Sequence, residues 1–434
     1  MSHERTITPL NAAILAGRWI RTAGVSSGLG RHWRANPDRR GRSAFTASDP
    51  ASLYAGAAGI VPFFLELAAA SGHEAYLDEA RRGGRFLAAT WREQPDLTLH
   101  HGITGTLFAL TEAGWELPEE GFEEEARAVA DRVAASARVF ADGPGWTGDP
   151  AQRGDGGIIL GLLRAATMLG VPRYEELALE AGERVARLAV PGHRFGDCPG
   201  IPSDAVAPGF LMGTSGTAFL LARLYGVSGE TAFLEAARRG AGFVRSVATV
   251  ADRCAYVPHH LPQGRGLHYL GYCSGSAGAA RMFYELYRVA GDPADLDWVE
   301  RLAHGVIASG VPYRQSAGLW NTACQCCGLA GLLELFVGLW SVTGREPYRE
   351  YARALAEHLI GRAHRDAAGL RWYQAYRRLR PGEVSADTGY LLGAAGIGAA
   401  LLHLDAAEQE GEVRRTLLLP DNPFPAIPSP AFLR

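Results

Sequence analysis

Cysteine is scarce in this sequence, with only six among 434 residues. A small secreted domain held together by disulfides needs a denser set of cysteines, so a disulfide framework is excluded. Four of the six lie in two short stretches, 271–278 and 324–331, which indicates a common chemical role. The N-terminus also lacks a basic segment followed by an apolar stretch and a small-residue cleavage site, so we expect a cytoplasmic protein.

Long apolar runs and an excess of charge are missing as well. No stretch approaches the roughly 20 consecutive apolar residues that a membrane-spanning helix requires, so no membrane span is expected. The formal net charge is -3, so no nucleic-acid partner is expected. Apolar residues make up 47% of the chain, which is enough for a large core and excludes a disordered composition.

A G-x-x-G step recurs seven times, and each copy opens an apolar segment. Successive copies begin 46 to 65 residues apart, which is typical of a helical repeat protein. Glycine has no side chain, so it allows the start of each helix to pack closely on its neighbours. The seven copies are 56–59, 102–105, 154–157, 213–216, 275–278, 328–331 and 393–396.

Amphipathic segments lie between these copies, so one of their faces meets solvent. The segments that follow each glycine step, such as 332–337, are apolar nearly all round and belong inside. One outer and one inner helix per unit predicts an all-α fold, an (α/α) toroid with seven inner and seven outer helices. The amphipathic segments are 76–89, 119–135, 174–188, 232–247, 297–308 and 347–360.

We expect the toroid to be a single domain spanning residues 1–418. Residues 9–22 are predicted to form a first amphipathic helix, and the connection up to residue 48 is predicted to wrap the surface without regular structure. The Pro-rich end, 419–434, is predicted to be an irregular tail with no fold of its own.

The toroid brings the residues before each glycine step to one common mouth. Units five and six are adjacent, so Cys273 falls beside Cys326 and Cys327. Three thiolates suit zinc, and a catalytic zinc keeps its fourth position open for water or substrate. Buried free thiols are the alternative, although two neighbouring cysteines in a turn cannot both point into one apolar core. Cys324 could be a fourth ligand that makes the zinc structural; we favour the open site.

These features resemble the lanthionine synthetase C-like family, the lantibiotic cyclases, over nearly the whole chain. The seven glycine-rich inner helices and the two cysteine-containing glycine turns carry the resemblance. It implies an (α/α) toroid with a Zn²⁺ ion that activates the Cys thiols of a dehydrated precursor peptide. These thiols add to dehydroalanine or dehydrobutyrine and form lanthionine or methyllanthionine rings. A separate dehydratase is expected to prepare the peptide.

The zinc ligands of the family are a Cys in the fifth unit and a Cys-His pair in the sixth. The matching residues here are Cys273, Cys326 and Cys327, so Cys327 stands where His is usual. A third thiolate makes the ligand set more negative, so a bound substrate thiolate is expected to be more nucleophilic. Two further departures are Met212, in place of a His before the fourth glycine step, and Ser274, in place of a Tyr.

The reaction also needs a proton donor for the enolate, and His100 or His101 at the mouth is the first candidate. Asp149 is displaced by one position from the family's Asp and could orient such a His. Arg265 could stabilise the enolate, and His268 could replace the Arg that the family carries before the fifth unit's Cys. The alternatives are a His that bonds a carbonyl, an N-capping Asp and an Arg on a solvated rim.

Three functions are compatible with this pattern. The first is a peptide cyclase that forms thioether rings, and the second is a zinc-holding, peptide-binding scaffold that has lost its proton-transfer residues. Met212 and Ser274 support the scaffold. The third is a carbohydrate-active toroid, which needs paired acidic residues at the mouth. Only Asp149 and Asp155 are placed there, and a sugar enzyme has no need of the cysteines.

Overall fold

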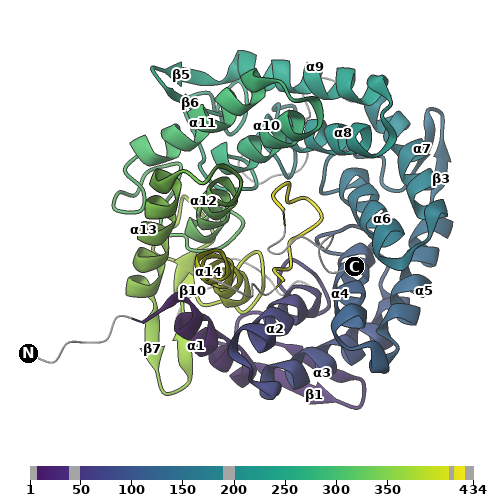
Figure 1. The fold of residues 1–434 in the computed structure, drawn as a ribbon, viewed down its shortest axis with the longest axis vertical. Coiled ribbons are helices and arrows are strands. Elements are labelled where there is room, and N and C mark those ends of the chain that lie inside the picture. Colours follow the sequence, from purple (N-terminus) through teal and green to yellow (C-terminus); the bar gives the residue numbers. More distant parts are fainter. Residues whose placement is uncertain (1–6, 39–48, 189–200, 410–414, 426–434) are drawn as a thin grey trace, which may run out of the picture.

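The computed structural model of the protein describes residues 7–38, 49–188, 201–409 and 415–425. In these residues fourteen α-helices form two concentric rings, which confirms the predicted all-α toroid (Figure 1). The inner ring consists of α2 (Ala57–Ser71), α4 (Ile103–Glu116), α6 (Asp155–Leu169), α8 (Thr214–Ser228), α10 (Ser276–Ala290), α12 (Leu329–Thr343) and α14 (Ala394–Glu408). The outer ring consists of α1 (Pro9–Thr22), α3 (Glu74–Thr90), α5 (Phe122–Ala135), α7 (Pro172–Leu188), α9 (Thr231–Val247), α11 (Pro293–Ala308) and α13 (Glu346–Arg362).

The ring is closed by the two ends of the helical chain. Each of the first six inner helices packs against the outer helix that follows it, whereas α14 packs against α1. The first helix of the sequence is therefore the seventh outer helix. Its buried face includes Ala13, Trp19 and Ile20, and these side chains join the same hydrophobic core as the inner helices.

The hydrophobic pattern explains which helices lie inside. Every residue of α12 from Leu329 to Leu339 is buried, because this helix touches neighbours on all sides. In contrast, α9 buries one stripe and leaves its other face to solvent. Burial of apolar surface favours folding by about 25 cal/mol per Å², so the continuous inner core is the main source of stability.

Five two-stranded antiparallel sheets decorate the described part of the toroid. The first, β1 with β2, lies in the connection that the sequence predicts to be without regular structure, so that prediction is wrong there. Short hairpins of this kind carry too few residues for a clear alternation of polar and apolar side chains. The strands are β1 (Gly24–Ser27), β2 (Gly30–Trp33), β3 (Arg138–Phe140), β4 (Gly143–Gly145), β5 (Thr249–Ala251), β6 (Cys254–Tyr256), β7 (His364–Asp366), β8 (Gly369–Arg371), β9 (Gln374–Ala375) and β10 (Val384–Ser385).

The turns that precede the inner helices are joined to one another by backbone hydrogen bonds. Each bond runs from the N–H group of one turn to the carbonyl oxygen of the next turn around the ring. The bonds are Tyr54 to His100, Arg153 to Leu211, Leu211 to Cys273, Cys273 to Cys326, Cys326 to Leu391 and Leu391 to Tyr54, with N···O distances of 2.8 to 3.1 Å. Residues one or two positions before each glycine step are thereby held in one layer.

The C-terminal segment lies in the middle of the ring, where Figure 1 shows it in yellow. Its described part, 415–425, contains neither helix nor strand. It is nevertheless packed inside the toroid, since Leu417, Asp421 and Phe424 are buried. Residues 426–434 of the predicted tail lie outside the described residues.

None of the described helices is both long and apolar enough to cross a lipid bilayer. This finding agrees with the absence of long apolar runs in the sequence.

Candidate metal centre

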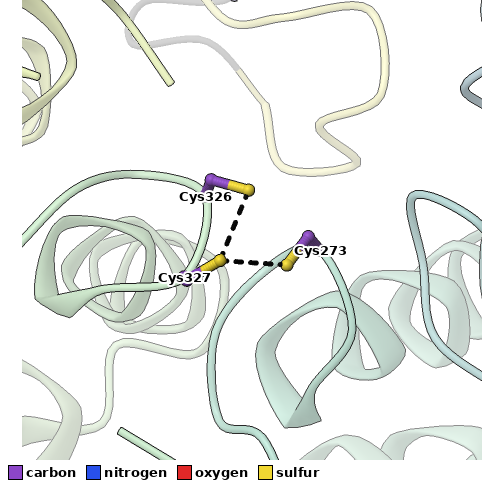
Figure 2. A group of neighbouring side chains, drawn as sticks. All are labelled: Cys273, Cys326 and Cys327. Carbon is purple, nitrogen blue, oxygen red and sulfur yellow. Dashed lines mark hydrogen bonds between the residues drawn. The ribbon is translucent and has the colours of Figure 1, made fainter. Parts of the chain in front are cut away.

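The three predicted thiols meet at one point of the turn layer. Cys273 lies on the turn before α10, and Cys326 and Cys327 lie on the turn before α12 (Figure 2). The Sγ atom of Cys327 is 3.3 Å from that of Cys273 and 3.6 Å from that of Cys326. All three sulfur atoms lie within 4.8 Å of one another.

Backbone contacts between the two turns bring the sulfurs together. The N–H group of Cys273 donates to the carbonyl oxygen of Cys326, at an N···O distance of 3.1 Å. Gly271 lies directly against Cys327, where a Cβ atom on Gly271 would sit 2.8 Å from the Cα atom of Cys327. Two turns can approach so closely only because Gly271 has no side chain.

The geometry of the three sulfurs fits a tetrahedral metal ion. Zinc binds thiolates at about 2.3 Å, which places two sulfurs of a tetrahedron about 3.8 Å apart. The observed sulfur distances of 3.3 and 3.6 Å come close to this value. Hydrogen bonds from Cys326 and Cys327 lower the pKa of Cys273, whereas the same contacts raise the pKa of Cys326 and Cys327. Three such thiols can bind a cation as thiolates, with their protons released to solvent.

Cys324 does not belong to the thiol cluster. Its Sγ atom is 3.5 Å from the hydroxyl oxygen of Thr322, and it accepts hydrogen bonds from backbone N–H groups of Cys326 and Cys327. Burial raises the pKa of its thiol. Cys324 therefore shapes the turn that presents its two neighbours, and the arrangement leaves three sulfurs for a metal.

A tyrosine that sequence reasoning left without a role stands next to the cluster. The hydroxyl group of Tyr54 donates to the Sγ atom of Cys326, at 3.2 Å. Tyr54 is two residues before Gly56, just as Cys273 and Cys326 are two residues before their own glycine steps. This shared register is the sequence signal that could have identified it.

The two adjacent histidines at the mouth have different surroundings. His101 is exposed, and its ring lies on that of Tyr54 with 5.0 Å between the centroids. Neighbouring atoms desolvate this ring and lower its pKa, an effect that Asp96 partly offsets. His100 is 1% exposed and points inward, with its Nε2 atom 3.4 Å from the hydroxyl oxygen of Tyr272. Burial lowers the pKa of His100 to about 4. Of these two histidines, only His101 is exposed to solvent.

The comparisons with known proteins identify the family. The family model described as "Lanthionine synthetase C-like protein" matches residues 47–418, which is most of the chain. The chain belongs to the lanthionine synthetase C-like family. No curated protein matches the sequence significantly.

Solved structures similar to this family member share its fold at low sequence identity. One is "Nisin cyclase", with a TM-score of 0.58 and 12% identity over 84% of this chain and 95% of that chain. Another is an unsaturated glucuronyl hydrolase from Bacillus sp. GL1, with a TM-score of 0.49 and 17% identity over 93% of this chain and 96% of that chain. At 12% identity the likeness to nisin cyclase shows the fold alone.

In this lanthionine synthetase C-like chain, the carboxylate of Asp149 at the mouth is engaged by neighbouring groups. The carboxylate of Asp149 accepts from the backbone N–H of Ala151 and forms an ion pair with Arg153, at 2.6 Å. Arg153 in turn contacts the sulfur of Met212 at 3.6 Å. Asp149, Arg153 and Met212 therefore form a contact group of their own on the turns before α6 and α8.

The other two candidates from the sequence, His268 and Arg265, have different surroundings. His268 bonds the hydroxyl of Thr249 at 3.0 Å and packs on Tyr256, so it lies against the hairpin of β5 and β6. Arg265 is exposed, and none of the described residues forms a side-chain ion pair with it. Sequence spacing suggested that both approach Cys273, but the hairpin of β5 and β6, which His268 contacts, was not predicted.

A second histidine pair lies near Cys273 instead. The Nδ1 atoms of His259 and His260 are 3.0 Å apart, and the ring of His259 lies 4.0 Å from that of Tyr269. Burial lowers the pKa of His259 to about 4, an effect that Cys273 opposes. These histidines come from a loop that has no fixed spacing to the glycine steps, so the sequence carries no signal that could have placed them.

Proposed function

We propose that this protein is a zinc-dependent cyclase that joins the Cys thiols of a dehydrated precursor peptide to dehydroalanine or dehydrobutyrine residues. The products are lanthionine or methyllanthionine rings. The observation that carries the proposal is the cluster of Cys273, Cys326 and Cys327 in a chain of the lanthionine synthetase C-like family. The fold likeness to nisin cyclase supports it. Dehydration of the peptide belongs to a separate protein in this scheme.

The three cysteines would hold the zinc ion, and bound zinc offers an open position at which a peptide thiol loses its proton. Tyr54 donates a hydrogen bond to Cys326 and thereby lowers the negative charge on that ligand. A less negative thiolate would donate less electron density to the zinc ion, so the tyrosine would tune the reactivity of the site.

Proton delivery falls to the histidines of the second unit. Addition of the thiolate to the alkene leaves an enolate in the peptide, and one proton on its α-carbon completes the ring. His101 is exposed and sits on Tyr54, so it can exchange protons with solvent and reach a peptide bound at the cluster. His100 is buried behind the turn layer, where it contacts the hydroxyl group of Tyr272. Asp149 and His268 are engaged by other side chains, and Arg265 is exposed without an ion pair to any described residue.

One observation favours a second candidate, a zinc-holding scaffold that binds a peptide without closing rings. Asp149 is engaged by Arg153, and Met212 stands where the family pattern has a proton-transfer His. A carbohydrate enzyme has no such support, because the other acidic residue, Asp155, is buried and bonded to Thr147 and Arg184.

The deciding experiment follows free thiols and peptide mass together. The purified, zinc-quantified protein is incubated with a dehydrated, Cys-containing peptide, and remaining thiols are titrated over time. We expect thiols to disappear without a change in peptide mass, since an intramolecular addition loses no atoms. The same protein freed of metal by a chelator should leave the thiols untouched until zinc is restored. A constant thiol titre with full zinc occupancy would instead establish the scaffold.

A further inference from the structure

The C-terminal segment 415–425 is bound by side chains from most of the inner ring. Arg415 pairs with Glu112 of α4 at 2.6 Å, and the backbone N–H of Leu417 donates to Glu66 of α2 at 2.5 Å. Arg223 of α8 donates to the carbonyl oxygen of Asn422 at 3.3 Å. Five helices, α2, α4, α8, α10 and α12, contact the segment through side chains or glycine surfaces. A segment held from so many sides has a fixed place in the fold.

The most buried side chain of this segment is a carboxylate. Asp421 is 0% exposed. Its Oδ2 atom accepts a hydrogen bond from the hydroxyl of Tyr272 and lies 3.9 Å from Nε2 of His100, while Oδ1 is 3.5 Å from a guanidinium nitrogen of Arg281. Burying a charge is costly unless it is paired, so these three partners explain why the carboxylate is tolerated here.

The contacts of Asp421 lead directly to the thiol cluster. Tyr272 is the residue before Cys273, and His100 is the residue before His101. The guanidinium of Arg281 lies over the ring of Tyr272 at 4.8 Å, and Phe210 meets that ring edge-on. Tyr272 is therefore held by three contacts: a hydrogen bond from its hydroxyl, a guanidinium over its ring and a second aromatic ring packed against it.

The segment also separates two spaces in the centre of the ring. On the side of Tyr272 and Gln325 the remaining cavity measures about 10 Å³, which is room for one water at most. On the other side lies a cavity of about 410 Å³ lined by four arginines, among them Arg164 and Arg288. In the described part of the chain, this packing favours an approach of the peptide from the mouth.

We propose that the C-terminal segment is part of the active site: it closes the channel behind the thiol turns, and Asp421 positions Tyr272 and His100 there. The catalytic part of this inference rests on the proposed cyclase function. Asp421 keeps the Tyr272 hydroxyl turned inward and favours the His100 tautomer with its proton on Nε2. The Nδ1 atom of His100 is buried and has no hydrogen-bond partner among the described residues.

A spectroscopic test addresses the positioning without any assay of cyclisation. The side-chain nitrogen signals of ¹⁵N-histidine protein are recorded, and those of His100 are assigned with the variant His100→Gln. We expect wild-type signals of a neutral ring protonated at Nε2. In Asp421→Asn the preference for this tautomer should weaken, so the two nitrogen shifts of His100 move toward each other. Unchanged His100 shifts in Asp421→Asn overturn the proposal.

The matched control is Asp295→Asn, which removes another buried carboxylate that pairs with an arginine. Asp295 is 3% exposed and pairs with Arg245 between α11 and α9, away from the thiol turns. Both substitutions keep the size of the side chain and lose its charge. Asp295→Asn should lower the unfolding temperature and leave the His100 signals where they are. His100 signals that move equally in both variants show a general loss of structure, and they overturn the proposal.

The kinetic test uses the same pair of variants. Asp421→Asn should lower kcat for ring closure by about tenfold, with KM and zinc content unchanged, because His101, the residue after His100, loses its alignment while the mouth stays intact. In a Tyr272→Phe background the same substitution should cost much less, since Asp421 acts through that hydroxyl. Equal effects in both backgrounds contradict the positioning role. A wild-type protein that closes no rings refutes the cyclase function alone, and the nitrogen signals then decide on Asp421.

Discussion

The inner ring contains two sets of three ionisable side chains, the triad of His403, Glu66 and Glu334 and the thiol cluster. The two sets differ in how their charges are paired. In the middle of the helices, His403 bonds Glu66 at 2.9 Å and Glu334 at 2.6 Å, so each charge has an opposite charge beside it. In the turn layer, the thiol cluster contains three groups of the same kind, each of which becomes an anion when it loses its proton. The first set pairs its charges within the protein, whereas the second, once deprotonated, would be paired by the proposed zinc ion.

This difference separates structural from functional ionisable groups. All of these side chains are buried except that of Cys327, which is half-buried, so exposure alone does not distinguish the two sets. What distinguishes them is whether each charged group has a partner of opposite sign. A buried charge without such a partner is costly, so it persists where it has a function. The comparison predicts that changes in the thiol cluster affect function with little effect on folding, and that changes around His403 do the reverse.

The largest effect is expected from Cys326→Ala. The variant should lose its zinc and lower the rate of ring closure by about 10³-fold or more, because no site remains at which the peptide thiol is deprotonated. Its unfolding temperature should match that of the metal-free wild type. Elemental analysis, the thiol assay and thermal unfolding provide the three readouts. Cys254→Ala, which removes a thiol outside the cluster, serves as the control, and a Cys326→Ala protein that keeps zinc and activity refutes the ligand assignment.

The next largest effect is expected from His403→Gln. This substitution leaves two buried carboxylates without their cation, and breaking a buried ion pair costs about 3 to 5 kcal/mol of unfolding free energy. Urea denaturation of metal-free protein measures the loss. His304→Gln on the outer helix α11 should change stability by less than about 0.5 kcal/mol. If His403→Gln proves as stable as the control, the triad does not stabilise the ring.

The pH dependence of stability gives a third test of the same triad. Burial lowers the pKa of His403, but Glu334 and Glu66 outweigh it and raise the net pKa from 6.5 to about 10. Because the folded-state pKa is the higher one, the stabilisation is fully present below about pH 6.5 and is lost as the pH rises through about 10. The stability difference between wild type and His403→Gln should therefore shrink between about pH 6 and about pH 9.5. A difference that stays constant argues against a charged His403.

A smaller effect is expected from Gly271→Ala. The added Cβ meets the backbone of Cys327 at 2.8 Å, so the two turns must move apart and the sulfurs with them. Zinc affinity, measured by competition with a chromogenic chelator, should fall by about tenfold or more. Gly242→Ala, where a Cβ meets nothing within 4 Å, should leave the affinity unchanged and stabilise the helix slightly. Equal zinc affinities for the two variants would mean that close packing of the turns is not needed.

The repeat explains why the fold could be predicted from the sequence. Each glycine step encodes a close contact that only glycine allows: a Cβ on Gly278 or Gly331 would meet a carbonyl oxygen at 2.1 or 2.2 Å. The same register predicted that Cys273, Cys326 and Cys327 share a mouth, and the structure brings them together. Ring closure by residues 9–22 was not predicted, because an amphipathic helix does not reveal its partner.

The parts of the site that the sequence did not reveal come from segments outside the repeat. His268, a candidate near Cys273, packs on a hairpin that is too short to predict. Asp421 lies in a Pro-rich stretch without periodicity, and its contacts with Tyr272 and Arg281 exist only once the ring has closed around it. The sequence identifies what recurs with the helical period, whereas contacts across the ring depend on the closed structure.

X-ray absorption spectroscopy of the zinc-loaded protein tests the central claim most directly, since it counts the sulfur atoms around the metal. The account predicts three sulfurs at about 2.3 Å and one lighter ligand, oxygen or nitrogen, at the open position. On addition of a Cys-containing dehydrated peptide, the lighter ligand should be replaced by a fourth sulfur. Four sulfurs in the absence of peptide, or a protein that binds no zinc at all, would contradict the account.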